Sequence, residues 1–180
     1  MPEAANERLS IDDLHKTFLN ALGAAVASHG DLEKKPLEVD LTSPLPPKLR
    51  VYMYNATYPP GGRTMGEHKI QLIVPGQNRG ERGNFDSSGG RIPLLVGYRQ
   101  DLGIFMLWDA ELYVDFSYSR NVQVKPETVY EAFAQGLARQ KRNLWSQPKE
   151  IVIAADARHL AQAILERQQE TIKRLVGGGT

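Results

Sequence analysis

Lys69-Ile-Gln-Leu-Ile-Val74 and Ile92-Pro-Leu-Leu-Val-Gly-Tyr98 are the two apolar runs that decide the fold of this chain. Each is short, rich in aliphatic residues and bounded by turn-forming residues, which predicts two β-strands. Between them lies Gly76–Arg91, a long loop of glycines, amides, hydroxyls and arginines. A loop of this length inside a compact domain is unusual without a function, so it is the first place to look for a binding surface.

More strands are predicted on both sides of this pair, and together they indicate a mostly antiparallel β core. The expected strands are residues 49–58, 104–109, 112–117, 122–124 and 150–155.

Helices are expected at three places around this core. Ser10, with Asp13 three residues later, is typical of a helix start, and this first helix is expected to end at Gly30. Pro126 suits the first turn of a second helix, which should end near Arg142. Asp156 can cap a third.

The sequence therefore predicts an α+β fold, with a curved, mostly antiparallel sheet or pseudobarrel flanked by about three helices. We expect the N-terminal helix and a proline-rich connector in residues 1–48, the β-rich core with two helices in 49–176, and a glycine-rich linker or tail in 177–180. A glycine run after a helix has the composition of a flexible tether.

Length and composition narrow the classes of protein. A chain of 180 residues fits one domain, and the absence of cysteine excludes disulfides and thiolate metal sites. No apolar stretch is long enough to span a membrane, and no signal peptide is recognisable at the N-terminus, so we expect a cytoplasmic protein. The formal net charge of +1 means that any affinity for DNA must come from how charge is distributed.

Cations in and beside the long loop suggest contacts with a phosphate backbone. Arg79, Arg82 and Arg91 are interleaved with glycine and amide residues, and Lys69 opens the strand that precedes the loop. Guanidinium groups bind phosphate and base edges through paired hydrogen bonds. We expect these four residues to contribute affinity for duplex DNA.

Two further segments offer groups that read bases. Asn55, Thr57 and Arg63 flank a tight Pro-Pro-Gly-Gly turn, although such a turn also serves any chain reversal. Tyr118-Ser119-Arg120-Asn121 presents hydroxyl, guanidinium and carboxamide groups in succession. These are the groups that contact phosphate, guanine and adenine, so both segments are candidates for DNA binding.

An aromatic cluster follows the apolar run Ile104-Phe-Met-Leu107. Trp108 and Tyr113 most simply pack in the core with their polar tips near water. Beside Asp109 they could instead form a pocket that stacks on an extruded base and accepts a hydrogen bond from its amino group.

Catalytic motifs are weak. The scattered histidines match no zinc pattern, and neither a nucleophile elbow nor a phosphate loop occurs, so we expect no catalytic residue, metal or cofactor in this domain. Glu67-His-Lys69 fits half of the Glu-x-Lys motif of magnesium-dependent restriction nucleases, but the preceding strand supplies no acid. A nuclease centred on Glu67 and Lys69 is the alternative enzyme hypothesis.

Several blocks of the sequence resemble the N-terminal DNA-recognition domain of bacterial restriction endonucleases across about residues 48 to 155. They include Phe105-Met-Leu-Trp-Asp109 and Phe116-Ser-Tyr-Ser-Arg-Asn-Val-Gln-Val124. The resemblance implies a B3-like fold, as in the effector domains of EcoRII-like enzymes. It also implies that the 55–63 turn, the 76–91 loop and the 118–123 segment grip a major groove.

In that setting the chain is a specificity module that reads a short duplex site, which could carry a modified base. The resemblance also implies a separate nuclease domain, in cis beyond Gly179 or in trans, which would use Mg²⁺. A third hypothesis needs no nucleic acid: the long loop would meet an acidic protein partner.

Overall fold

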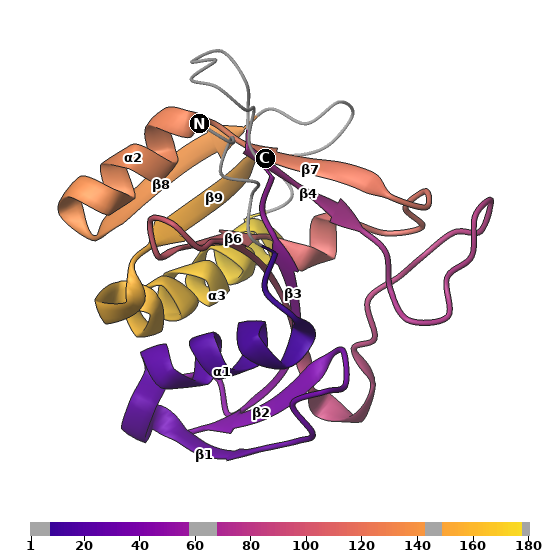
Figure 1. Ribbon diagram of the computed structural model, residues 1–180, viewed down its shortest axis with the longest axis horizontal. Helices are drawn as coiled ribbons and strands as arrows, with labels where there is room; N and C mark the ends of the chain where they lie inside the picture. Colours follow the sequence, from indigo (N-terminus) through magenta and orange to yellow (C-terminus); the bar gives the residue numbers. More distant parts are fainter. Residues whose placement is uncertain (1–7, 58–67, 143–148, 178–180) are drawn as a thin grey trace, which may run out of the picture.

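The computed structural model describes residues 8–57, 68–142 and 149–177. Within these ranges the chain forms an α+β fold with an open seven-stranded sheet, a separate two-stranded ladder and three α-helices (Figure 1). The expected curved sheet flanked by helices is confirmed, and the seven-stranded sheet is not closed into a barrel.

The seven-stranded sheet has two edge strands from distant parts of the sequence. Its order is β1 (Val26–His29), β2 (Leu37–Leu41), β3 (Lys48–Asn55), β5 (Ile92–Arg99), β6 (Ile104–Trp108), β9 (Glu150–Ala155) and β8 (Leu137–Arg142). Neighbouring strands are antiparallel except β3 and β5, which run parallel from Leu49↔Ile92 to Asn55↔Tyr98. A parallel pair requires a crossover connection, and here that connection contains β4 (His68–Leu72).

Each face of the sheet covers its own apolar core. Helices α1 (Ile11–Leu22) and α3 (Leu160–Val176) pack on one face, where Val51 and Met53 of β3 are buried with them. Helix α2 (Pro126–Gln135) and the ladder of β4 with β7 (Arg120–Val124) cover the opposite face, where Tyr52 and Tyr54 are buried. Alternate residues of a strand point to opposite faces, so β3 contributes to both cores.

The first helix is shorter than its sequence predicts. Ser10 caps it as expected, accepting a hydrogen bond from the Asp13 backbone N at 3.3 Å, but the helix ends at Leu22 rather than Gly30. Gly23 adopts a φ of 54°, and the chain then enters β1, which pairs with β2. The proline-rich segment is likewise not a plain connector, because it contains β2 and thereby widens the sheet.

Two expectations near the C-terminal half also needed correction. Residues 112–117 do not form a strand: a 3-10 turn over Ala110–Leu112, capped by Asp109, interrupts the chain there. The second helix ends at Gln135, where Gly136 takes a φ of 91°, and residues expected to continue it form β8. None of the helices in the described ranges combines the length and apolar character needed to cross a bilayer.

Candidate nucleic-acid interface

The ladder of β4 and β7 has one buried face and one polar face. Ile70, Leu72, Val122 and Val124 are buried against the sheet. The intervening positions point outward, and the pairing sets Lys69 opposite Gln123 and Gln71 opposite Asn121. The result is a narrow ribbon whose exposed face carries one cation and three carboxamides, and we call it the ribbon face.

The first half of the long loop is anchored beside one end of this ribbon (Figure 1). Gly83 and Phe116 exchange two backbone hydrogen bonds, at 2.8 and 3.0 Å. The Gln77 carboxamide donates to the carbonyls of Glu81 and Phe116, and its oxygen accepts from the Val74 backbone N. Phe116 lies four residues before β7, so the loop and the start of β7 are held together.

Gly83 is required at this junction by close packing. A Cβ added there would lie 2.6 Å from both the Gln77 Oε1 and a ring carbon of Phe116. Beside it, Asn84 donates to the Asp115 carboxylate at 2.8 Å and accepts from the Asp115 backbone N at 2.9 Å. The loop is therefore an ordered part of the surface.

Two arginines of the long loop have solvent-exposed side chains. Arg79 is exposed, and Arg82 is exposed while its Nη1 donates to the Asp115 carbonyl at 3.2 Å. The nearby Glu81 carboxylate accepts from the Asn78 backbone N at 2.9 Å, and that hydrogen bond lowers the pKa of Glu81. The Glu81 carboxylate thus stabilises the turn at Asn78, and Arg79 and Arg82 remain exposed on either side of Glu81.

The 118–121 segment follows Phe116, which contacts the loop, and leads into the ribbon strand β7. Ser119 has a φ of 62°, in a turn that leads into β7, and Tyr118 and Ser119 are half-buried. The Arg120 guanidinium lies 4.9 Å from the centre of the Tyr113 ring, a cation–π contact that fixes its position. Asn121 points outward with Lys69 and Gln71 on the ribbon face, whereas Arg120 has the phase of the buried Val122 and lies against the Tyr113 ring.

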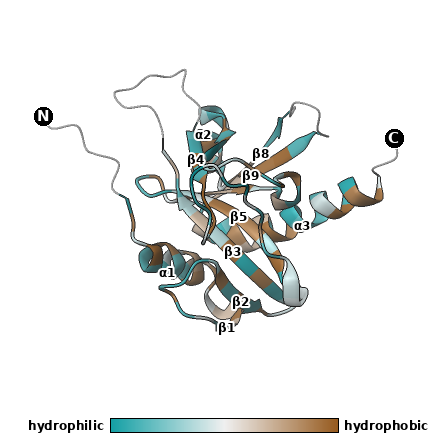
Figure 2. Ribbon diagram, turned by 90° about the vertical axis from the view of Figure 1, so that its right-hand side faces the viewer, coloured by the Kyte–Doolittle hydropathy of each residue, from teal (hydrophilic) through white to brown (hydrophobic). Residues whose placement is uncertain are grey.

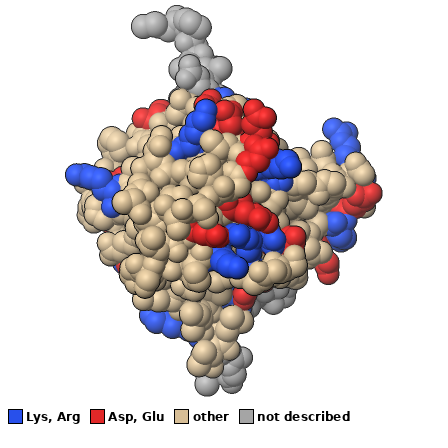
Figure 3. Space-filling model, turned by 90° about the horizontal axis from the view of Figure 1, so that it is seen from below, with Lys and Arg blue, Asp and Glu red and all other residues tan. Residues whose placement is uncertain are grey.

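Two other expected contact residues have internal roles in this structure. The Asn55 carboxamide exchanges two hydrogen bonds with the backbone of Leu9, at 2.9 and 3.0 Å. Arg91 forms ion pairs with Asp40 at 2.9 Å and Glu38 at 3.6 Å. On the face seen from below, where β1 and β2 lie in Figure 1, acidic and basic atoms are mixed and do not form one basic patch (Figure 3).

The aromatic cluster is likewise internal. Trp108 and Tyr113 are 1% and 2% exposed, and they donate to the Gln123 carbonyl at 2.9 Å and to Glu150 at 2.7 Å. The Asp109 carboxylate is buried and pairs with Arg174 at 2.9 Å. With their rings covered and their polar groups engaged, these side chains do not form an open base pocket here.

Arg63 and Glu67 lie outside the described residues, so the Pro-Pro-Gly-Gly turn and the nuclease hypothesis have no geometry to report. Lys69 is the second residue of β4 and pairs with Gln123. Within residues 8–57, 68–142 and 149–177, no group of three or more histidine and acidic side chains is arranged to hold a metal ion.

Sequence reasoning missed Gln71 and Gln123, which complete the ribbon face. The signal was present, because Lys69-Ile-Gln71 and Asn121-Val-Gln123 alternate polar and apolar residues with the period of a half-buried strand. Which two strands would pair was the missing information.

Comparison with known proteins gave one match. The family model described as methylase-associated X1 matches residues 47–164, which is more than half of the chain. The match includes β3, both ribbon strands and the long loop. No curated protein and no solved structure was found to match.

Proposed function

The chain belongs to the methylase-associated X1 family, and from this premise we propose that it is a DNA-binding accessory module of a restriction–modification system. The family description links the domain to methylases, which in such systems act on DNA. Within that setting we propose the finer role that the resemblance suggests: the module reads a short duplex site for a nuclease domain located in cis or in trans. That partner domain would carry the Mg²⁺.

The ribbon face is the observation that carries this proposal. The major groove of B-DNA is about 12 Å wide and admits a two-stranded β-ribbon. The β4–β7 ladder is two strands wide except at Lys69, whose backbone also exchanges two hydrogen bonds with Thr57. Its inner face is already buried, so its outer face is the one available to a partner. Carboxamides pair with adenine through N6 and N7, which makes Gln71, Asn121 and Gln123 suitable for base edges.

The surrounding cations suit the phosphate backbone on both sides of a groove. Lys69 lies on the ribbon, Arg79 and Arg82 lie on the anchored loop, and Arg120 lies at the start of β7. We assign phosphate contacts to Lys69, Arg79 and Arg82, and a base-edge or phosphate contact to Arg120. Tyr118 and Ser119, in the turn before Arg120, are further candidates for phosphate.

A binding selection on randomised duplexes, with and without cytosine methylation, tests the proposal. We expect retention of duplex DNA that weakens steeply with salt, because each neutralised phosphate contributes about −0.9 to the slope of log K against log salt. Arg79→Ala with Arg82→Ala should lower affinity for all sequences and reduce that slope by about 2. Arg158→Ala, which removes an exposed arginine before α3, is the matched control and should change neither.

The base contacts need a separate measurement. Gln71→Ala with Asn121→Ala should relax the preference at individual positions of the selected site, by about 1–3 kcal/mol for each lost pairing. An unchanged preference would contradict the assignment of the ribbon face to base reading.

Two outcomes would replace the proposal. Cleavage of the duplex in Mg²⁺ that disappears in Lys69→Ala would establish the nuclease hypothesis. Failure to retain any duplex, methylated or not, would favour the third hypothesis, in which the loop meets an acidic protein.

A further inference from the structure

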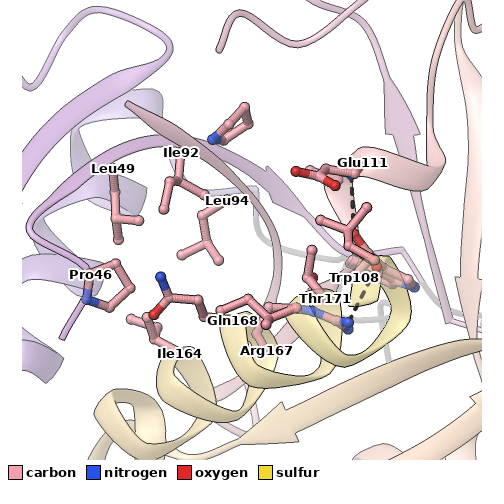
Figure 4. Close-up of a pocket in the computed structure, with 15 residues that line it drawn as sticks. Pro46, Leu49, Ile92, Leu94, Trp108, Glu111, Ile164, Arg167, Gln168 and Thr171 are labelled. Carbon is pink, nitrogen blue, oxygen red and sulfur yellow. Dashed lines mark hydrogen bonds and ion pairs between the residues drawn. The ribbon is translucent and has the colours of Figure 1, made fainter. Parts of the chain in front are cut away.

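A small apolar cavity lies between α3 and the strand ends on the side of the sheet away from the ribbon face. Its volume is about 140 Å³, and Figure 4 shows aliphatic side chains from both elements around it. Leu49, Ile92 and Leu94 come from β3 and β5, and Ile164, Ile172 and Leu175 come from α3. Leu49 and Leu94 belong to the core beneath α1 and α3, so the cavity lies on the α1 and α3 side of the sheet.

The inner end of this cavity is polar and buried. Arg167, whose side chain is 5% exposed, lies 3.6 Å from the Asp109 carboxylate, and both residues line the cavity. The Arg167 Nε–H has no hydrogen-bond acceptor within the part of the chain that the structure describes. That N–H is covered by protein atoms, so the Arg167–Asp109 pair forms a closed wall of the cavity, and the contacts open to a ligand are those of the apolar lining.

The rim of the cavity exposes apolar side chains. Ile92 is 41% exposed, and Ile172 and Leu175 are 50% and 57% exposed. The last turns of α3 extend past the strands and carry apolar residues into solvent (Figure 2). A contiguous apolar rim around a cavity is typical of a site that binds another molecule.

Positive charge adjoins this apolar rim. A second, more open cavity of about 320 Å³ shares Asp109 and Arg167 with the first and is lined by Lys141, Lys149 and Lys173. Lys173 pairs with Glu170, whereas Lys141 and Lys149 have no acidic partner among the described residues. A partner seated in the apolar cavity would therefore place its flanking groups beside uncompensated cations.

We propose that this edge of α3 binds a protein segment in which one aliphatic or aromatic side chain is flanked by aspartate or glutamate. A cavity of about 150 Å³ holds a molecule the size of benzene, so a leucine or phenylalanine side chain matches the space. The sugar–phosphate backbone of DNA has no comparable apolar group, which is why a protein partner is favoured over nucleic acid.

The site goes beyond the proposed DNA binding and does not depend on it. It lies on the α1 and α3 side of the sheet, and the ribbon lies on the other side. A protein segment and a duplex can therefore bind at the same time, which is the arrangement that an accessory module needs in order to connect an enzyme to its DNA.

Peptide phage display against the whole chain tests the inference, followed by affinity measurements on the selected peptides. We expect a consensus with one large apolar residue between acidic residues. Leu175→Glu should lower peptide affinity at least about tenfold, since it places a carboxylate on the apolar rim. Lys141→Glu with Lys149→Glu should lower it about threefold to tenfold, less so at high salt.

Phe133→Glu on α2 is the matched control, because Phe133 is 59% exposed and lies on the other face of the sheet. It should leave peptide affinity unchanged. Leu175 is itself exposed, and an unchanged circular dichroism spectrum and Tm will show that its variant is folded. Duplex binding should be the same in Leu175→Glu as in the wild type.

Four results would overturn the inference. The selected peptides could lack the acidic and apolar consensus or bind Leu175→Glu as tightly as the wild type. Duplex DNA could displace the peptides and lose affinity in Leu175→Glu, which would assign the surface to nucleic acid. Sedimentation could show self-association that Leu175→Glu abolishes, which would identify the occupant as a second copy of this chain.

Discussion

Replacing Asp109 by asparagine separates a structural role of this residue from a role in reading a base. In the structure its carboxylate pairs with Arg174 at 2.9 Å and with Arg167 at 3.6 Å, and it caps the following 3-10 turn by accepting from the Glu111 backbone N at 3.2 Å. The asparagine variant keeps the size and the capping oxygen. It removes the charge that compensates the two arginines and replaces Oδ2, the oxygen that both of them contact, by an amide NH2 that cannot accept from them.

The expected loss of stability follows from the burial of this pair. The side chains of Asp109 and Arg167 are 3% and 5% exposed, so the arginine would remain in the interior without its nearest carboxylate. Removing one partner of a buried ion pair costs about 3–5 kcal/mol, and the retained cap favours the lower end, about 3 kcal/mol. For a protein of this size 1 kcal/mol corresponds to about 2–4 °C, so the Tm should fall by roughly 6–12 °C.

Thermal unfolding followed by circular dichroism measures this change, with duplex binding measured in parallel below the Tm. Asp12→Asn is the matched control, because Asp12 forms a largely exposed pair with Lys16 and its loss should shift the Tm by about 2 °C at most. A shift of less than about 2 °C in the asparagine variant would refute the reasoning about burial. A normal Tm with weakened DNA binding would instead support the hypothesis that Asp109 contacts an extruded base.

Three other variants probe the sheet and its surface. Gly97→Ala should destabilise the fold by about 1–3 kcal/mol in urea unfolding, because its Cβ would lie 2.8 Å from the Trp108 ring; unchanged stability would contradict this packing. Burial, together with the Arg99 guanidinium, lowers the pKa of His68 from 6.5 to about 4. The unfolded chain therefore binds a proton that the folded chain lacks as pH falls from about 6.5 towards 4, so the Tm should fall over that range, and less steeply in His68→Gln. Arg91→Ala should lower the Tm through loss of its ion pairs with β2 while leaving DNA affinity unchanged, and a selective loss of affinity would restore Arg91 to the interface.

The strands of the core were predictable because their signal is local. Ile104–Trp108 is apolar throughout and is buried on both faces, and His68–Leu72 alternates as a strand with one buried face does. Pro126 and Ser10 likewise mark helix starts where the structure has them. In each case the residues that define the element lie within it.

The errors arose where a distant partner decides the conformation. Val26–His29 follows a helix that Gly23 ends, and it becomes a strand because β2 pairs with it. Residues 137–142 include three cations and fit a helix, yet β9 pairs with them along their whole length. The same limit applies to the interface, since the long loop is held beside the start of β7 by distant contacts such as those of Gly83 and Gln77 with Phe116.

The two strands of the ribbon, β4 and β7, do not belong to the seven-stranded sheet. β4 lies in the crossover from β3 to β5, and β7 lies in the link from β6 to α2, so both are parts of connections rather than of the seven-stranded sheet. Connections tolerate sequence change better than the elements they join. Evolution can therefore alter the specificity of this module by exchanging outward residues of two short segments, while the scaffold that supports them is inherited intact.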